Sequence, residues 1–197
     1  MEENKSSDKK LAILKAISLS ELYISISLLI FAIASQNLYV LLILGSLFTK
    51  HIPEQIFKKL SEKFDWQIGK RPVDAVDCNS YNSGGPAKGS GIISGHVFNL
   101  SSLTFFLIYS FTENSRTMTT KEATLIGILF IGIFSLIYAR IELHCHTKEQ
   151  TVIGFIGGAV WGYVMFLLVN SITNMSDRLK SDKLKIGGLI NGCQVIG

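Results

Sequence analysis

Four long apolar runs, almost free of charged residues, constrain the fold of this chain more than any other feature. They cover residues 16–35, 91–111, 123–140 and 151–173. A helix needs about 20 predominantly apolar residues to cross the hydrocarbon core of a bilayer. Each run is close to that length, so the sequence predicts membrane-spanning helices.

A fifth apolar segment begins after a turn at Gln36-Asn37 and is too short to span by itself. Residues 38–48, LYVLLILGSLF, are apolar, and the helical pattern then continues to residue 64 with polar residues mixed in. We therefore expect 38–64 to form one long helix whose second half leaves the bilayer. A kink is expected at Pro53, because proline removes a helical hydrogen bond.

The polar segments divide the rest of the chain. Residues 1–15 are expected to be a flexible polar tail, and 174–197 a C-terminal tail without a recognisable motif. Residues 65–90 contain glycines and prolines at a density that excludes a helix, so they are expected to be a long loop. The predicted fold is all-α: a polytopic membrane helical bundle at 16–173 with about five transmembrane helices.

The composition agrees with an integral, multi-pass membrane protein surrounded by membrane lipids. Hydrophobic residues make up 48% of the chain and charged residues 17%, whereas a soluble protein has about 25% charged residues. The net charge of +4 comes from basic residues divided among several loops. They form no single basic face, which argues against nucleic-acid binding. The sequence does not indicate an oligomeric state.

Three polar clusters fall on the same side of the predicted bundle. They are Lys63 with Lys70-Arg71-Pro72, then Ser94-Gly95-His96, then the run from Arg140 to His146. Arginine binds phosphate oxygens in a bidentate manner, a helix N-terminus binds anions, and histidine can attack phosphorus or donate a proton. The clusters therefore suit a phosphate ester. Considered alone, Ser94 can also be a plain helix N-cap, with His96 an incidental polar residue.

In order, spacing and position at helix ends, the clusters resemble the type 2 phosphatidic acid phosphatase superfamily, which includes lipid phosphatases and vanadium haloperoxidases. The family pattern is Lys-x6-Arg-Pro, then Pro-Ser-Gly-His, then Ser-Arg-x5-His-x3-Asp. Arg71-Pro72, Ser94-Gly95-His96 and Arg140-x5-His146 match it, and the resemblance covers residues 63–150.

The resemblance implies a phosphohydrolase that needs no metal and no cofactor. Its substrate would be a lipid phosphate or an isoprenoid diphosphate. His146 would attack phosphorus to give a phosphohistidine, and His96 would protonate the leaving oxygen. The residues implied for binding the phosphate oxygens are Arg71, Arg140, Ser94 and the Gly95 amide.

The chain departs from the family pattern in its first and third motifs. Phe64 stands at the lysine position, so Lys63, or else Lys70, is the candidate for that role. Gln150 stands at the aspartate position, where a carboxylate would orient the nucleophile, and Glu149 is the other candidate for orienting His146.

Two smaller substitutions are Ile93 for the family proline and Ala139 for the family serine, and both should be tolerated. The departures leave an alternative open: a catalytically weak or inactive phosphatase-like membrane protein with a phospholipid-binding or structural role. A small transporter or scaffold without phosphate chemistry is a third possibility.

The cysteines and the orientation of the protein remain open at this point. Cys78 and Cys145 share one side of the predicted bundle, and they can form a disulfide there or stay as separate structural thiols. His144 and His146 form a His-x-His pair. The sequence has no third ligand at a spacing characteristic of metal sites, so no metal site is expected.

The resemblance places the catalytic face outside the cytoplasm. The same face holds 13 of the 19 Lys and Arg residues, which favours the cytoplasm.

Overall fold

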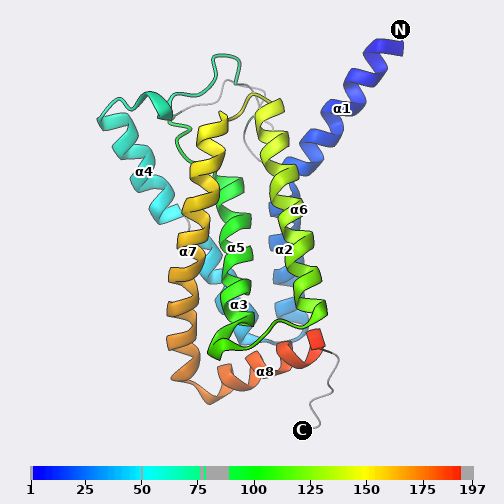
Figure 1. Ribbon diagram of the computed structural model, residues 1–197, viewed down its shortest axis with the longest axis vertical. Helices are drawn as coiled ribbons and strands as arrows, with labels where there is room; N and C mark the ends of the chain where they lie inside the picture. Colours follow the sequence, from blue (N-terminus) through cyan, green and yellow to red (C-terminus); the bar gives the residue numbers. More distant parts are fainter. Residues whose placement is uncertain (1, 50, 76–77, 79–88, 192–197) are drawn as a thin grey trace.

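The computed structural model describes residues 2–49, 51–75, 78 and 89–191. Within these residues the chain forms α-helices and two short 3-10 helices, with no strand (Figure 1). The α-helices are α1 (Glu2–Ser18), α2 (Ser20–Ala34), α3 (Leu38–Phe48), α4 (His51–Lys63), α5 (Gly95–Phe111), α6 (Thr120–Glu142), α7 (Lys148–Asn174) and α8 (Asp177–Asn191). The 3-10 helices are η1 (Gln67–Gly69) and η2 (Glu113–Ser115).

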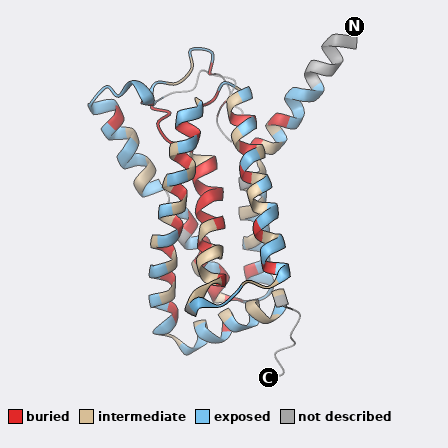
Figure 2. Ribbon diagram, in the orientation of Figure 1, coloured by how far each residue is buried: buried red, intermediate tan, exposed pale blue. Residues whose placement is uncertain are grey.

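Helix α5 is the centre of the bundle. Ten of its 17 residues are buried, including Asn99, Ser101, Ser102 and Thr104, and Figure 2 shows it as the most continuously buried helix. The Thr104 hydroxyl donates to the Leu100 carbonyl at 2.8 Å, which satisfies one of these polar groups within the helix. Helix α5 packs most extensively against α7 and next against α6.

Glycines in α7 allow the close approach of α5. A Cβ on Gly154 would lie 3.0 Å from the Ser94 carbonyl oxygen, and one on Gly158 would lie 2.6 Å from the Ser101 Cβ and still closer to the Phe98 carbonyl. Backbones can approach this closely only where the side chain is absent. This contact brings the N-terminus of α5 next to the N-terminus of α7.

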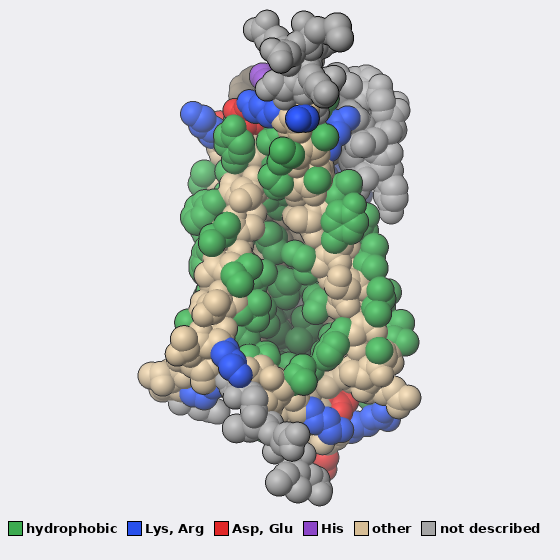
Figure 3. All heavy atoms as spheres, turned by 90° about the vertical axis from the view of Figure 1, so that its right-hand side faces the viewer, with side chains coloured by type: hydrophobic (Ala, Val, Ile, Leu, Met, Phe, Trp, Pro, Cys, Tyr) green, Lys and Arg blue, Asp and Glu red, His purple; other side chains and the backbone are tan. Residues whose placement is uncertain are grey.

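Two helices of the described part, α6 and α7, are long and apolar enough to cross a membrane. A third span results if α1 and α2, bent by 45° at their junction, count as one. The expected number of about five is not confirmed. Helix α5 has 17 residues, or about 26 Å of rise, less than the ~30 Å hydrocarbon core. Figure 3 shows a hydrophobic flank bounded at both ends by lysine and arginine side chains.

The segment 38–64, expected to be one kinked helix, forms two helices. Helix α3 ends at Phe48 and α4 begins at His51, so the interruption precedes Pro53. Proline is then the third residue of α4, within the first turn, where its missing N–H has no helical acceptor to lose. Helix α4 leans away from the bundle (Figure 1).

Helices also occupy part of both expected tails. Helix α1 begins at Glu2, and α8 lies across the end of the bundle opposite α4 (Figure 1). The Asp182 carboxylate of α8 accepts the Leu38 N–H at 3.0 Å, at the start of α3. The Asp182 carbonyl accepts from the Asn37 amide at 3.1 Å, and Lys183 pairs with Glu113. These contacts hold α8 against α3 and the loop after α5.

Candidate active site

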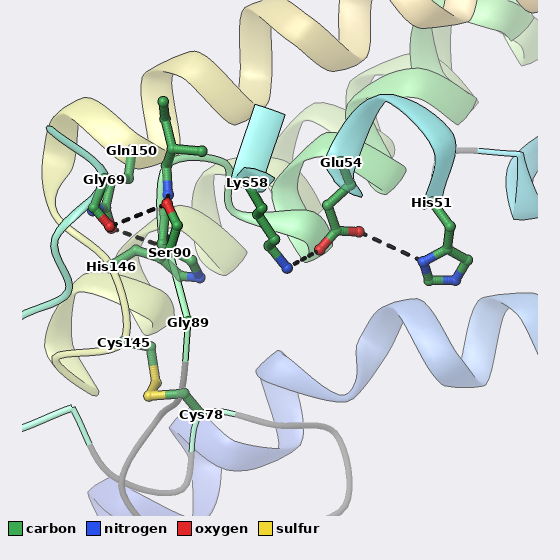
Figure 4. Close-up of polar contacts among 12 residues, drawn as sticks. His51, Glu54, Lys58, Gly69, Cys78, Gly89, Ser90, Cys145, His146 and Gln150 are labelled. Atoms are coloured by element: carbon green, nitrogen blue, oxygen red, sulfur yellow. Dashed lines mark hydrogen bonds and ion pairs between the residues drawn. A yellow bond between two sulfur atoms is a disulfide. The ribbon is translucent and has the colours of Figure 1, made fainter. Parts of the chain in front are cut away.

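Gln150 joins the segments that carry the three sequence motifs. Its side chain is fully buried, and its Nε2 donates to the carbonyls of Ile68 and Lys70, both at 2.8 Å. Its Oε1 lies 3.2 Å from the His146 Nδ1, and its backbone carbonyl accepts the Ser94 N–H at 3.4 Å. Through its side chain and its backbone carbonyl, Gln150 therefore connects the segments that carry all three motifs; Figure 4 labels Gln150 and His146.

The local sequence Thr147-Lys-Glu-Gln150 explains why this side chain turns back toward His146. Thr147 is the N-cap of α7, and its hydroxyl accepts the Gln150 N–H at 3.3 Å. The Gln150 Oε1 in turn accepts the Thr147 N–H at 3.2 Å. This reciprocal capping box holds the glutamine at the start of the helix, beside the histidine.

His146 is held in one tautomer. Its Nδ1 lies 3.1 Å from the Gly91 carbonyl and 3.2 Å from the Gln150 Oε1. The position of Oε1 follows from the network, since the two carbonyls of Ile68 and Lys70 require the Nε2 amide on their side. Because both groups at Nδ1 are acceptors, Nδ1 carries the proton and Nε2 keeps its lone pair.

The surroundings of His146 keep the ring neutral. The residue is 4% exposed. Burial, together with the charges of Arg140 and Arg71, lowers the pKa of His146 to about 3, and hydrogen bonds to Gly91 and Gln150 oppose this only in part. At neutral pH the ring is an uncharged imidazole with a free lone pair on Nε2, which is the form that can attack phosphorus.

The two arginines flank this ring and are held by main-chain carbonyls. Arg140, in the last turn of α6, is 3% exposed, and its Nη2 donates to the Cys78 carbonyl at 2.8 Å. Arg71 donates from Nη1 to the Cys145 carbonyl at 3.1 Å and from Nε to the Gly89 carbonyl at 3.2 Å. Burial lowers the pKa of Arg71, which nonetheless remains charged at neutral pH.

A disulfide joins the two cysteines whose carbonyls accept hydrogen bonds from Arg71 and Arg140. Cys78 and Cys145 are bonded, with Cα atoms 5.3 Å apart (Figure 4), and both are buried. The sequence left this pairing open. Each half of the disulfide thus contributes the carbonyl that holds one of the two arginines.

The N-terminus of α5 provides the next part of the site. Ser94 occupies the N-cap position, yet its hydroxyl makes no capping bond, so the plain N-cap interpretation does not describe it. This Oγ is fully buried and has no hydrogen-bond partner among the described residues. A buried hydroxyl without a protein partner at a helix start is a feature of sites that bind anions.

His96 follows in the first turn of α5 and lines an apolar cavity. This cavity, of about 270 Å³, lies between α2, α3 and α5. Its polar lining is formed by His96, His51, Asn99, Ser18 and Ser25, and its apolar wall by Leu22, Ile26, Leu29, Leu44, Leu47 and Phe48.

The other expected site residues lie elsewhere. The Lys63 ammonium is 5.6 Å from the centre of the Phe64 ring, and Lys70 pairs with Asp65 at 3.3 Å while exposed to solvent. Lys70 instead contributes its carbonyl, which binds Gln150. Glu149 is exposed and hydrogen-bonded to Thr147, so Gln150 is the candidate that contacts His146.

His144 turns away from the site and pairs with Asp74 at 2.9 Å on the surface. Among the described residues, no group of three His, Cys, Asp or Glu side chains is placed to share a metal ion.

Two residues of α4 that reach the site were not among the residues predicted from the sequence. Glu54 packs against Gly95, and Lys58 pairs with Glu54. Their spacing of four residues is a common helical ion pair, but only the folded structure brings that pair to the start of α5.

Comparison with known proteins gives one match. A family model described as the PAP2 superfamily matches residues 26–173, a range that contains all three motifs. No curated protein and no solved structure matches the chain.

Proposed function

The chain belongs to the PAP2 superfamily, and from that premise we propose that it is an integral, multi-pass membrane phosphatase that hydrolyses a lipid phosphate or an isoprenoid diphosphate through a phosphohistidine. The superfamily supports a phosphatase-type activity. The lipid substrate, the covalent intermediate and the role of each residue are the parts that we propose here.

The observation that carries this proposal is the state of His146. Its Nδ1 proton is held by Gly91 and Gln150, its ring is neutral, and two arginines lie beside it. A histidine that served only to fill the core would not need two cations next to it, since they make the ring harder to protonate. A nucleophile facing a phosphate dianion does need them.

In the first step, the Nε2 lone pair attacks phosphorus as the bond from phosphorus to the leaving oxygen breaks. Arg71, Arg140, the Ser94 hydroxyl and the Gly95 amide bind the three other phosphate oxygens, where negative charge builds up. His96 gives a proton to the leaving oxygen. The product is a phosphohistidine at His146 and a free lipid alcohol, or a lipid monophosphate from a diphosphate.

In the second step, water attacks phosphorus and the bond from phosphorus to Nε2 breaks. His96, now neutral, accepts the proton from this water, so that inorganic phosphate leaves and both histidines return to their starting states. The residues named supply the nucleophile, the acid–base group and the countercharge, and water is the only other reactant.

The proposed lipid character of the substrate is supported by the cavity beside His96. Because His96 is the proposed acid, the leaving oxygen must lie next to its ring, and the chain attached to that oxygen extends from there. The cavity of about 270 Å³ at this ring has an apolar wall. The six apolar side chains of that wall suit an acyl or isoprenoid chain, which would bury apolar surface against them.

The test is phosphate release from long-chain lipid phosphates by the protein purified in detergent, with a chelator present. We expect activity in the wild type and a loss of at least about a thousandfold in His146→Ala, since the residual catalysis would come from binding alone. His144→Ala, two residues away on the surface, is the matched control and should retain activity. Turnover that survives His146→Ala would contradict the mechanism. Absence of turnover in the wild type would favour the inactive, phospholipid-binding alternative.

A further inference from the structure

A carboxylate lies at the start of α5, where the proposed site would bind phosphate. A Cβ placed on Gly95 would be 3.0 to 3.2 Å from the three atoms of the Glu54 carboxylate. Glu54 reaches this point from α4, and its side chain is only 12% exposed. A negative charge is favoured at a helix N-terminus, so the carboxylate is stable where it lies.

Two features support an anion site at this position. The adjacent Ser94 hydroxyl is fully buried and has no partner among the described residues. The Arg71 guanidinium is close enough to Glu54 for the carboxylate to raise the pKa of that arginine, against the larger lowering caused by burial. The phosphate of a substrate would seek the same arginine and the same helix terminus.

Lys58 completes the arrangement. Its ammonium contacts the Glu54 Oε1, and its side chain is 24% exposed. On the other side of the carboxylate, the His51 Nδ1 lies 3.7 Å from Oε2 (Figure 4). The two lysines expected from the sequence, Lys63 and Lys70, point elsewhere. Lys58, unlike Lys63 and Lys70, therefore pairs with a carboxylate that lies at the start of α5.

Glu54 can leave this position without unfolding its helix. Ser61 is the only buried residue of α4, and the helix is tied to the loop at its C-terminal end, where Glu62 accepts the Ser90 N–H at 3.0 Å. The N-terminal half, which carries Glu54, has no buried residue. Because the Glu54 side chain is already 12% exposed, we expect a change of rotamer to be sufficient to withdraw the carboxylate toward solvent.

We infer that the Glu54 carboxylate occupies the position at which the proposed site binds phosphate, and that the incoming phosphate displaces it and takes over its contact with Lys58. Glu54 is then an internal competitor for phosphate, and Lys58 is a phosphate-binding residue in place of the lysine that is out of register. The inference rests on the proposed function for the identity of the ligand.

The test measures binding of inorganic phosphate to the purified protein by calorimetry, separately from hydrolysis. Glu54→Gln should bind phosphate about tenfold more tightly than the wild type, because the competing charge is gone. Lys58→Met should bind about tenfold more weakly. The double variant should fall between them, and Lys59→Met, which removes the neighbouring exposed lysine, should match the wild type. Tenfold is the effect of one partly screened charge pair.

Equal affinity in all five proteins, or no detectable binding by Glu54→Gln, would overturn the inference. If Glu54→Gln fails to fold, Glu54→Asp retains the charge on a shorter side chain and should show a smaller gain in the same direction. The lipid assay separates the two proposals. Hydrolysis with unchanged phosphate affinities refutes this inference alone, and the predicted affinities without hydrolysis refute the proposed function alone.

Discussion

Gln150 is the residue at which this chain departs most from the family pattern, and its hydrogen bonds explain why a glutamine suits this position. Its amide donates two hydrogen bonds, to the Ile68 and Lys70 carbonyls, while its oxygen accepts at His146. A carboxylate can accept but cannot donate. The glutamine therefore holds the first motif and orients His146, the proposed nucleophile, at the same time, although it brings no charge to stabilise the ring.

From this we predict that Gln150→Asp does not improve the enzyme. The Ile68 and Lys70 carbonyls would lose their donors and face a negative charge, at a cost of about 1–3 kcal/mol for each unsatisfied group. We expect a lower melting temperature and no gain in kcat, measured beside Glu149→Gln as a surface control. A large increase in kcat with unchanged stability would contradict this, and would show that Gln150 performs the role of the family aspartate less well than an aspartate does.

The buried neutral His146 also predicts how stability depends on pH. Its folded-state pKa of about 3 lies below the usual value of 6.5, so the unfolded chain takes up the proton first as the pH falls. The free energy of unfolding is therefore unaffected by the protonation of His146 above about pH 6.5. Between about pH 6.5 and pH 3 it falls by about 1.4 kcal/mol per pH unit, because only the unfolded chain binds the proton.

Thermal unfolding of the wild type and His146→Gln across this range measures the effect. The wild type should lose more stability than the variant as the pH falls. Parallel curves would contradict the assignment of a neutral, buried ring.

At the scale of elements, the contact between α5 and α7 positions the site, because it places Ser94 and Gln150 side by side. Gly158→Ala should disturb this contact, since the new methyl group would overlap the Phe98 carbonyl and Ser101. Overpacking of this kind costs about 1–3 kcal/mol. Gly127→Ala in α6, with nothing within 4 Å of the new methyl group, is the matched control.

Gly127→Ala should leave stability unchanged or raise it, because alanine favours the helix. Thermal unfolding in detergent, together with phosphatase activity, measures both variants. If the two behave alike, the close approach of α5 and α7 is not what positions the site.

The sequence predicted best those helices whose position depends on local residues alone, namely on an apolar run and a capping motif. Helices α6 and α7 cover the apolar runs at 123–140 and 151–173, and each begins at a capping box that the sequence contains. Helix α5 begins at Gly95, later than the apolar run, because residues 91–94 form a buried loop that presents the Gly91 carbonyl to His146.

Contacts between distant segments could not be predicted in the same way. The helical pattern continues through residues 48–51, Phe-Thr-Lys-His, without a glycine or proline there to signal the interruption between α3 and α4. Neither the position of Glu54 on Gly95 nor the exposure of Lys63 follows from spacing, because both depend on where α4 packs. The motifs identified the chemical groups at the site, and the tertiary structure determined which of them meet.

At the scale of the whole molecule, the disulfide bears on orientation, which the distribution of basic residues left open. Structural disulfides occur mainly in oxidising compartments, so the Cys78–Cys145 bond leads us to expect the catalytic face outside the cytoplasm. Labelling of intact cells with a membrane-impermeant maleimide, in a Cys193→Ser background, tests this. Cys78 and Cys145 should label only after treatment with an impermeant reductant. Labelling that requires permeabilised cells would reverse the orientation.

The most direct test of the central claim, that His146 is the nucleophile, is to trap the intermediate. The protein is mixed with a ³²P-labelled lipid phosphate, quenched within milliseconds under alkaline conditions, and mapped by mass spectrometry. The structure predicts an acid-labile phosphoryl group on the peptide that contains His146, attached through Nε2, because Gly91 and Gln150 hold the proton on Nδ1. Phosphate release without any covalent label, or a label on another residue, would contradict the account.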